Sequence, residues 1–366
     1  MNIFWFFALM LLPLLGLSYV AWHVWALLPF SAPWRAACVG LGILCFLSLF
    51  LDFTGRLDAL PMPLARALYN IGTSSLIVLL YLGLLFLLLD LGRLFGWVPR
   101  TWLHANGPAA LCLLLAMVGL FAYGYVHYRH KQRVALNLTF ARPLPRPYRI
   151  LMASDLHLGY HNDRRELARW VDMMNAEHPD LILIAGDIID VSVRPLLAEG
   201  MAAEFRRLQA PVYACLGNHE YYSGCPQARR FYHDAGIRLL IDEAVAVDSA
   251  LLIVGRDDRT NRRRKPLSQL MPETHEAAHR PLSIVLDHQP YNLEEAERAG
   301  VDFQLSGHTH RGQVWPLSWI TDRMYECSWG SHRRSGTQYY VSSGLGIWGG
   351  RYRIGTQSEY VVATLQ

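Results

Sequence analysis

The stretch that decides the fold is residues 148–157, YRILMASDLH. Its first six residues form a short, mainly apolar run typical of a buried strand, and Asp155 and His157 come directly after it. The same arrangement recurs four more times along the chain. The later runs are LILIA before Gly186-Asp187-Ile188-Ile189-Asp190, VYACL before Gly217-Asn218-His219-Glu220, LSIVL before Asp287-His288, and VDFQL before Ser306-Gly307-His308-Thr309-His310.

These five strand ends together predict a metal centre. In an open α/β sheet, sites form beyond the carboxyl ends of the strands, so the side chains that follow each run are expected to meet at one rim. Taken singly, Asp155 could cap the next helix and Asn218 could be an ordinary turn residue. As a set, carboxylate, carboxamide and imidazole groups without thiolate suit divalent Mn, Fe, Zn or Mg.

The rest of the second half alternates between helix and strand patterns, which favours α/β layers. Helical segments are expected at 165–177, 195–208 and 293–299. Further strands are expected at 239–241, 244–247, 251–254, 339–341 and 360–365, which is consistent with a second sheet.

The first half of the chain has a different composition. Up to Val126 it is mostly Leu, Ala, Phe, Trp and Gly, whereas the residues after Arg129 are those of an ordinary soluble protein. Four stretches, 3–22, 36–51, 71–89 and 108–126, approach the roughly 20 apolar residues that cross a bilayer. A buried helix of a soluble bundle is the alternative, but residues 76–89 are apolar on nearly every helical face, which favours lipid.

We therefore expect a transmembrane helical domain over 1–128, a basic, proline-rich linker over 129–147 and a catalytic domain over 148–366. Four spans put both termini on one side of the membrane, and the distribution of Lys and Arg around the spans favours the cytoplasm. The expected location is the inner membrane of a bacterium. The net charge of +4 does not argue for nucleic acid, and the sequence indicates no oligomeric state.

The series D-x-H, G-D-x-x-D, G-N-H-E, an isolated His and G-H-x-H resembles the calcineurin-like metallophosphoesterase superfamily, from Tyr148 to the C-terminus. Segments 306–313 and 342–355 further resemble a membrane-associated phosphodiesterase branch, which usually carries Gly where this chain has Arg311. The resemblance implies a four-layer α/β/β/α sandwich, here preceded by an all-α transmembrane domain of about four helices.

The resemblance also implies a set of metal ligands. Two divalent ions are expected, with Mn as the first choice and Fe, Zn or Mg as alternatives. A first ion would be held by Asp155, His157 and His310, and a second by Asn218, His288 and His308. Asp187 would bridge them, because a shared carboxylate offsets the repulsion between neighbouring cations.

Four more residues have expected roles at the substrate. His219 would protonate the leaving oxygen as a general acid, and Asp190 would orient it. Arg311 and Arg353 are candidate contacts for substrate phosphate.

We expect a membrane-anchored dimetal phosphoesterase that hydrolyses a phosphodiester or pyrophosphate bond. Four spans are more than a simple tether requires, which favours a lipid-linked substrate and contact with membrane lipids. The alternatives are a protein phosphatase or a nuclease with the same dimetal site, and a membrane sensor or transport protein without catalysis.

Two features have two interpretations each. Glu220 is either a buried acceptor behind the ligands or a solvated acid. The basic run Arg262–Lys265 is either a mobile solvated loop or a docking site for anionic lipid headgroups or a phosphate-bearing substrate.

Overall fold

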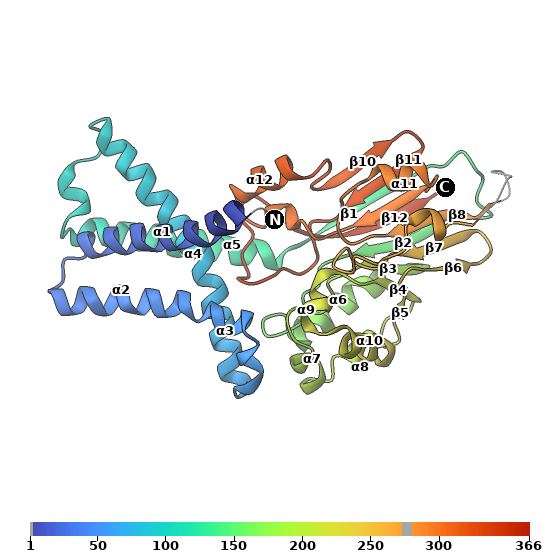
Figure 1. Cartoon of the computed structure of the whole chain (residues 1–366), viewed down its shortest axis with the longest axis horizontal. Helices are drawn as coiled ribbons and strands as arrows, with labels where there is room; N and C mark the ends of the chain where they lie inside the picture. Colours follow the sequence, from blue (N-terminus) through green and yellow to red (C-terminus); the bar gives the residue numbers. More distant parts are fainter. Residues whose placement is uncertain (1–2, 273–279) are drawn as a thin grey trace. The chain divides into compact units, whose positions relative to one another are not determined.

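The computed structural model describes residues 3–272 and 280–366 and divides the chain into two compact units. The first comprises Met1–Tyr125 with Gly349–Arg351, and the second comprises Val126–Trp348 with Tyr352–Gln366. Figure 1 shows the helical first unit in blue and cyan, and the two sheets of the second unit in green to red.

The first unit is built from helices. They are α1 Ile3–Leu27, α2 Ala32–Leu47, α3 Leu49–Phe53, η1 Arg56–Ala59, α4 Met62–Leu94, η2 Arg100–Leu103 and most of α5 Gly107–Arg129. By length and composition, three helices among the described residues can cross a membrane: 32–53, 62–94 and 107–129. The apolar part of α1 described in full, Leu11–Leu27, is shorter. All four predicted stretches are therefore helical, and the count of four spans is approximate.

A carboxylate on α4 has polar partners on both α1 and α4. The Asp90 carboxylate on α4 accepts a hydrogen bond from the Tyr19 hydroxyl (2.8 Å) and lies 2.9 Å from His23 Nε2 on α1. Arg93 is 3.2 Å from the other carboxylate oxygen. Because a buried polar group costs free energy unless it has partners, these contacts stabilise the packing of α1 on α4.

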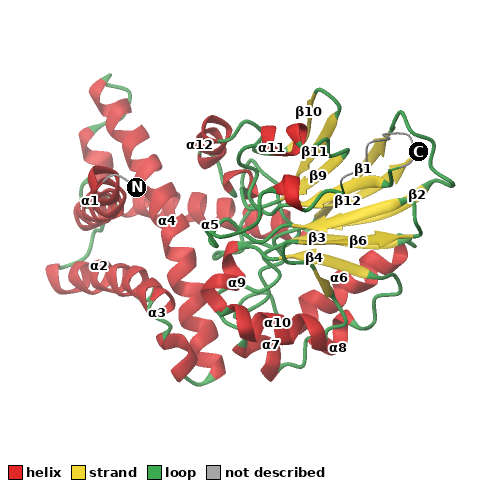
Figure 2. Ribbon diagram, turned by 45° about the vertical axis from the view of Figure 1, so that its right-hand side comes forward, coloured by secondary structure: helices red, strands yellow, loops and turns green. Residues whose placement is uncertain are grey.

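The second unit contains two six-stranded sheets (Figure 2). The first has the order β1-β12-β2-β3-β4-β5, and the second has the order β10-β11-β9-β8-β7-β6. The strands of the first are β1 Lys131–Leu138, β12 Ser358–Leu365, β2 Tyr148–Ala153, β3 Leu181–Ala185, β4 Val212–Cys215 and β5 Arg238–Leu239. The strands of the second are β10 Gly330–Arg334, β11 Thr337–Val341, β9 Phe303–Ser306, β8 Leu282–Leu286, β7 Leu251–Gly255 and β6 Glu243–Val247.

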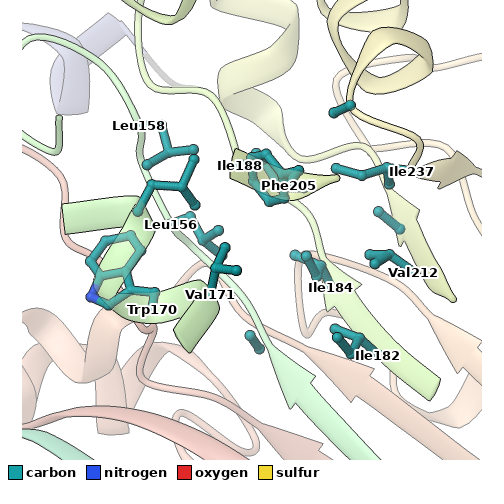
Figure 3. Close-up of a cluster of buried hydrophobic side chains, with 14 of the residues drawn as sticks. Leu156, Leu158, Trp170, Val171, Ile182, Ile184, Ile188, Phe205, Val212 and Ile237 are labelled. Carbon is teal, nitrogen blue, oxygen red and sulfur yellow. The ribbon is translucent and has the colours of Figure 1, made fainter. Parts of the chain in front are cut away.

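The second unit also contains helices, some of which cover the outer faces of the sheets. They are α6 Arg164–Ala176, α7 Arg194–Ala198, α8 Ala202–Phe205, α9 Asn218–Ser223, α10 Cys225–Asp234, η3 Leu267–Gln269, α11 Glu294–Arg298, η4 His310–Gly312 and α12 Leu317–Met324. Trp170 of α6 and Phe205 of α8 belong to the buried cluster that includes Ile184 of the first sheet, part of which is drawn in Figure 3.

Two further apolar cores complete the layers. Between the sheets, Ile150 and Leu183 of the first belong to one cluster with Ile284 of the second. Outside the second sheet, Val285 belongs to a cluster with Ala296 of α11. Three cores separate four layers, so the predicted α/β/β/α sandwich is confirmed.

The predicted linker is wrong in its first part. Residues 131–138 form β1, which pairs in parallel with β12 from Lys131↔Ser358 to Leu138↔Leu365. Its sequence, KQRVALNL, lacks a continuous apolar run because β1 is an edge strand with several exposed side chains. Only 139–147, which contains the prolines, is irregular.

Candidate metal centre

The parallel strands of both sheets end at one rim. Strands β2, β3 and β4 run parallel in the first sheet, and β7, β8 and β9 run parallel in the second. The loops after β2, β3 and β4 carry Asp155, His157, Asp187 and Asn218, and those after β8 and β9 carry His288, His308 and His310. The structure thus brings all seven predicted ligands together, four from one sheet and three from the other.

The first predicted ligand group is tightly gathered. His157 Nε2 lies 3.0 Å from His310 Nε2, and Asp155 Oδ1 lies 3.4 Å from His310 Nε2. His157 Nε2 is 3.8 Å from the same carboxylate oxygen. All three residues are buried. Two imidazole nitrogens this close repel each other through their lone pairs unless a proton or a cation lies between them.

The second group converges on an amide oxygen. Asn218 Oδ1 is 2.8 Å from His308 Nδ1 and 3.2 Å from His288 Nε2. Asp187 connects the two groups, because its Oδ2 is 3.1 Å from His288 Nε2 and 3.7 Å from His157 Nε2. Its other oxygen accepts a hydrogen bond from the backbone N–H of His219 (2.9 Å). This is the position that the predicted bridging carboxylate requires.

The electrostatics of the site fit divalent cations. Burial lowers the pKa of His308 to about 4 and holds the pKa of His310 well below its usual value, so both imidazoles are neutral and able to ligate a metal. Burial also raises the pKa of Asp155, which shows the cost of a carboxylate here without a counter-ion. At His288 the nearby Asp187 carboxylate outweighs burial and raises the pKa, so cation binding would displace that proton.

The backbone is strained at most ligands. Positive φ angles are found at Asp155 (54°), His157 (45°), Asp187 (52°), His308 (70°) and His310 (47°). Left-handed backbone at non-glycine residues costs on the order of 1 kcal/mol or more each and persists at functional sites where the surroundings enforce it. Five of the seven predicted ligands, which the short distances between side chains bring together, therefore also have a strained backbone.

Glycines make room for the carboxylates. A Cβ on Gly217 would lie 2.1 Å from Asp187 Oδ1, and a Cβ on Gly307 would lie 2.2 Å from Asp155 Oδ2. Each motif glycine therefore allows a backbone segment of one loop to contact a ligand from another.

Asp190 lies between two histidines. Its Oδ1 is 3.2 Å from His219 Nδ1, an ion-pair contact by distance, and 3.3 Å from Nδ1 of His157. Burial alone would lower the pKa of His219, but the Asp187 and Asp190 carboxylates raise it to about 9. His219 also lies within 4.8 Å of His157 and Asp187, measured between ligand atoms, so its geometry would also allow metal ligation.

Arg353 is placed behind the site and not at its open face, which corrects the predicted substrate contact. It is fully buried and donates to the carbonyl oxygens of His310 (2.7 Å) and Ser343 and to Ser358 Oγ (3.1 Å). Its guanidinium group therefore holds the loop that carries His310 in place through hydrogen bonds. Arg311 lies 4.0 Å from the centre of the Trp329 ring, a cation–π contact, and remains a candidate for substrate phosphate.

Two buried polar side chains form hydrogen bonds to the backbone around the predicted ligands. Glu220 is fully buried and accepts hydrogen bonds from the backbone N–H groups of Asp187 (3.1 Å), Ile189 (2.9 Å) and Gly217 (2.7 Å), which decides for the buried interpretation. Asn162, which sequence analysis missed, donates to the His157 carbonyl (3.1 Å). The N-H-E motif gave a signal for Glu220, whereas an Asn ahead of a helix gives none.

The basic run is partly built into the fold. Arg264 Nη1 and Arg256 Nη1 each lie 2.9 Å from one oxygen of the buried Asp287 carboxylate, next to His288. Arg262 and Arg263 are exposed. The interpretation as a mobile solvated loop is therefore wrong for Arg264, which is not available for lipid docking either.

A two-sheet sandwich with a buried Asp, Asn and His centre defines the class of metal-dependent phosphoesterases. Residues 148–312 match the family model of the calcineurin-like phosphoesterases. It is similar to an uncharacterized metallophosphoesterase of Aquifex aeolicus (29% identity; 69% of this chain, 98% of that one).

Other similar proteins are matched over only part of their own length. A transmembrane protein with metallophosphoesterase domain from Danio rerio is 29% identical over 68% of this chain and 60% of its own length. Among solved structures, a 5'-nucleotidase precursor of Thermus thermophilus has a TM-score of 0.37 at 16% identity; the match covers 56% of this chain and 49% of that one.

Proposed function

We propose that this protein is a membrane-anchored enzyme that hydrolyses a phosphodiester or pyrophosphate bond with two divalent ions, Mn being the first choice. The observation that carries the proposal is the position of Asp187, whose carboxylate lies between His157 of one ligand group and His288 of the other. A single structural ion would need only one of these groups, whereas a pair of ions needs a shared ligand.

The residues present fit the chemistry of phosphoryl transfer. Two divalent ions held by the seven side chains would supply charge stabilisation for the phosphate oxygens and an activated water. With its Nδ1 beside Asp190, His219 keeps Nε2 as the proton donor to the leaving oxygen. Its pKa of about 9 keeps the ring protonated, and the charge of bound cations would lower this value toward neutral pH.

The substrate is proposed to be lipid-linked, with the catalytic domain in the cytoplasm. Three membrane-length helices and relatives named as transmembrane proteins support a membrane location. A single hairpin of helices would tether a soluble domain, so the additional apolar helices favour a substrate that resides in the bilayer.

The first experiment measures turnover of a chromogenic phosphodiester by the full chain in detergent with Mn. Asp187→Asn is expected to abolish turnover and to reduce the bound metal, because the shared ligand loses its charge. His233→Asn is the matched control, since the His233 side chain is 90% exposed and lies outside the motifs. Normal turnover in Asp187→Asn would disprove the two-ion assignment.

A second experiment identifies the substrate class. The wild-type chain is assayed side by side on a phospholipid, a nucleotide linked to a lipid, a free nucleotide and a phosphopeptide. Preference for a lipid-linked ester is expected. Faster turnover of the phosphopeptide would favour a protein phosphatase and remove the lipid-linked proposal.

A further inference from the structure

The catalytic unit exposes a concentrated apolar surface. After residue 130, seven large hydrophobic side chains among the described residues are exposed, and five of them lie between residues 315 and 324. They are Trp315 (42% exposed), Leu317 (36%), Trp319 (66%), Ile320 (54%) and Met324 (60%). We call these five residues the α12 patch. Such contiguous exposed apolar groups on a soluble domain mark an interaction surface.

The helix that carries the patch exposes its apolar side chains and buries a polar one, which is the opposite of an ordinary surface helix. Leu317, Ile320 and Met324 follow the i, i+3, i+7 spacing of one helical stripe, and this stripe faces outward. The buried residue of α12 is the small, polar Ser318. A helix that served only to cover the sheet would bury Leu and Ile and expose Ser.

The α12 patch is held firmly beside the metal centre. Gly312, at φ +71°, lies so close to the start of α12 that a Cβ there would be 2.5 Å from the backbone nitrogen of Ser318. Gly312 ends η4, whose first residue is the ligand His310. At the other end of the helix, Asp322 accepts a hydrogen bond from Ser328. The Trp315 and Trp319 rings pack edge to face, 5.4 Å apart.

The composition of the patch identifies its partner. Trp side chains with aliphatic neighbours and nearby cations are typical of helices that lie in the headgroup region of a bilayer. Arg323 of α12 supplies an exposed positive charge next to the exposed Asp322. The same chain carries helices of membrane length, so the bilayer that they would span lies within reach of this domain at a high effective concentration.

We propose that α12 and Trp315 form an interfacial helix that inserts its apolar stripe into the lipid headgroup region of the membrane. Docking by this helix brings the His310 loop to the membrane surface, where a phosphate ester carried by a lipid resides. The insertion itself does not depend on the proposed hydrolytic function, and its test does not require activity.

The test uses the full chain in liposomes, with the six native cysteines replaced and a nitroxide spin label at Ile320→Cys. The matched control is a label at Leu197→Cys, since Leu197 is an equally exposed apolar residue (62%) on α7 of the same unit. We expect the label at 320 to collide with membrane-dissolved oxygen at least several-fold more than with a water-soluble nickel chelate, and the label at 197 to show the reverse.

Two outcomes would overturn the proposal. Equal access of the nickel chelate to both labels would place α12 in water, and shielding of the label at 320 from both probes would indicate a protein partner. If the cysteine-free chain does not fold, quenching by brominated lipids replaces the label. The emission of Trp319 is then measured as the difference between the wild-type chain and Trp319→Phe. We expect brominated vesicles to quench this emission, and an unquenched emission would also reject insertion.

A kinetic readout separates this proposal from the proposed function. The triple variant Trp319→Ser, Ile320→Ser, Met324→Ser is expected to hydrolyse a water-soluble diester at the wild-type rate and a vesicle-embedded ester at least tenfold more slowly. Equal rates on both substrates would remove any role of docking in turnover. Absence of turnover in the wild-type chain would reject the hydrolytic function and leave the spin-label result standing.

Discussion

At the scale of single residues, His219 is the side chain whose chemistry can be tested most directly. We predict that His219→Ala slows hydrolysis of an ester with a poor alkoxide leaving group by roughly 10²–10⁴-fold, the usual contribution of a general acid. An ester with a p-nitrophenolate leaving group should be affected far less, because it needs no proton. Metal content should be unchanged, which elemental analysis checks. A parallel loss of metal and of both activities would instead show that His219 is a ligand.

Arg353 illustrates what sequence could not predict at this scale. The motif residues were predictable because their types and their positions at strand ends suit metal ligation, and the structure brings all seven together. For an Arg, residue type alone does not say whether the guanidinium faces substrate or backbone. Only the fold shows that Arg353 satisfies the carbonyl of His310 from behind.

We therefore predict a stability effect at Arg353. Burial lowers its pKa to about 10, so the group is still charged at neutral pH, and Arg353→Met would leave buried carbonyls without donors. The expected loss is roughly 3 kcal/mol, from several hydrogen bonds to a charged donor, seen as a lower melting temperature in detergent. Arg333→Met, at an exposed site, is the matched control. Unchanged melting with lost turnover would restore the substrate-contact prediction.

At the scale of elements, the buried strands were predictable, whereas the edge strands β1 and β10 were not. Strands β2, β3 and β8 begin and end at the predicted residues, because strands covered on both faces are continuous apolar runs. Strands β1 and β10 were missed, since their sequences, KQRVALNL and GSHRR, are polar and half exposed. The partner of β1 is β12, far away in the chain, whereas β10 pairs with the adjacent β11; in both cases the polar sequence of the strand itself gives no apolar pattern to recognise.

Glu177, just after α6, connects three strands of the first sheet. Its carboxylate accepts hydrogen bonds from Arg133 of β1 (2.7 Å) and from the Tyr360 hydroxyl of β12 (3.1 Å) and contacts Arg149 of β2. The hydrogen bond from Arg133 is the main reason that the pKa of Glu177 is lowered. A carboxylate with a lowered pKa in the folded state stabilises the fold above its unfolded pKa, and this contribution is lost as pH falls through the folded value.

We therefore predict that Glu177→Gln lowers stability by about 1 kcal/mol at pH 7, the small value reflecting the partly exposed arginines. The difference from wild type should shrink as the pH is lowered below about 4, because the wild-type carboxylate is then protonated as well. Denaturant unfolding of the full chain at several pH values measures this. A difference independent of pH would show that packing, and not charge, is responsible.

At the scale of the whole molecule, the topology of the helices in the membrane can be tested with reporter fusions. With four spans and the N-terminus in the cytoplasm, we predict that a reporter fused after Gln366 is active in the cytoplasm. A reporter inserted at Gly96, between α4 and α5, should be active on the opposite side. Signals from the same side would show that α5 does not cross, and an external signal after Gln366 would overturn the cytoplasmic assignment.

The division of the ligands between two sheets has a consequence beyond catalysis. Asp155, His157, Asp187 and Asn218 belong to loops of one sheet, and the three remaining ligands belong to the other. Ions held by both sets would link the two sheets to each other. Because a ligand that binds only the native state lowers the population of unfolded protein, such ions would also slow degradation of the protein by proteases. Metal supply in the cell would then govern how long each copy of the protein survives, and not merely how fast it works.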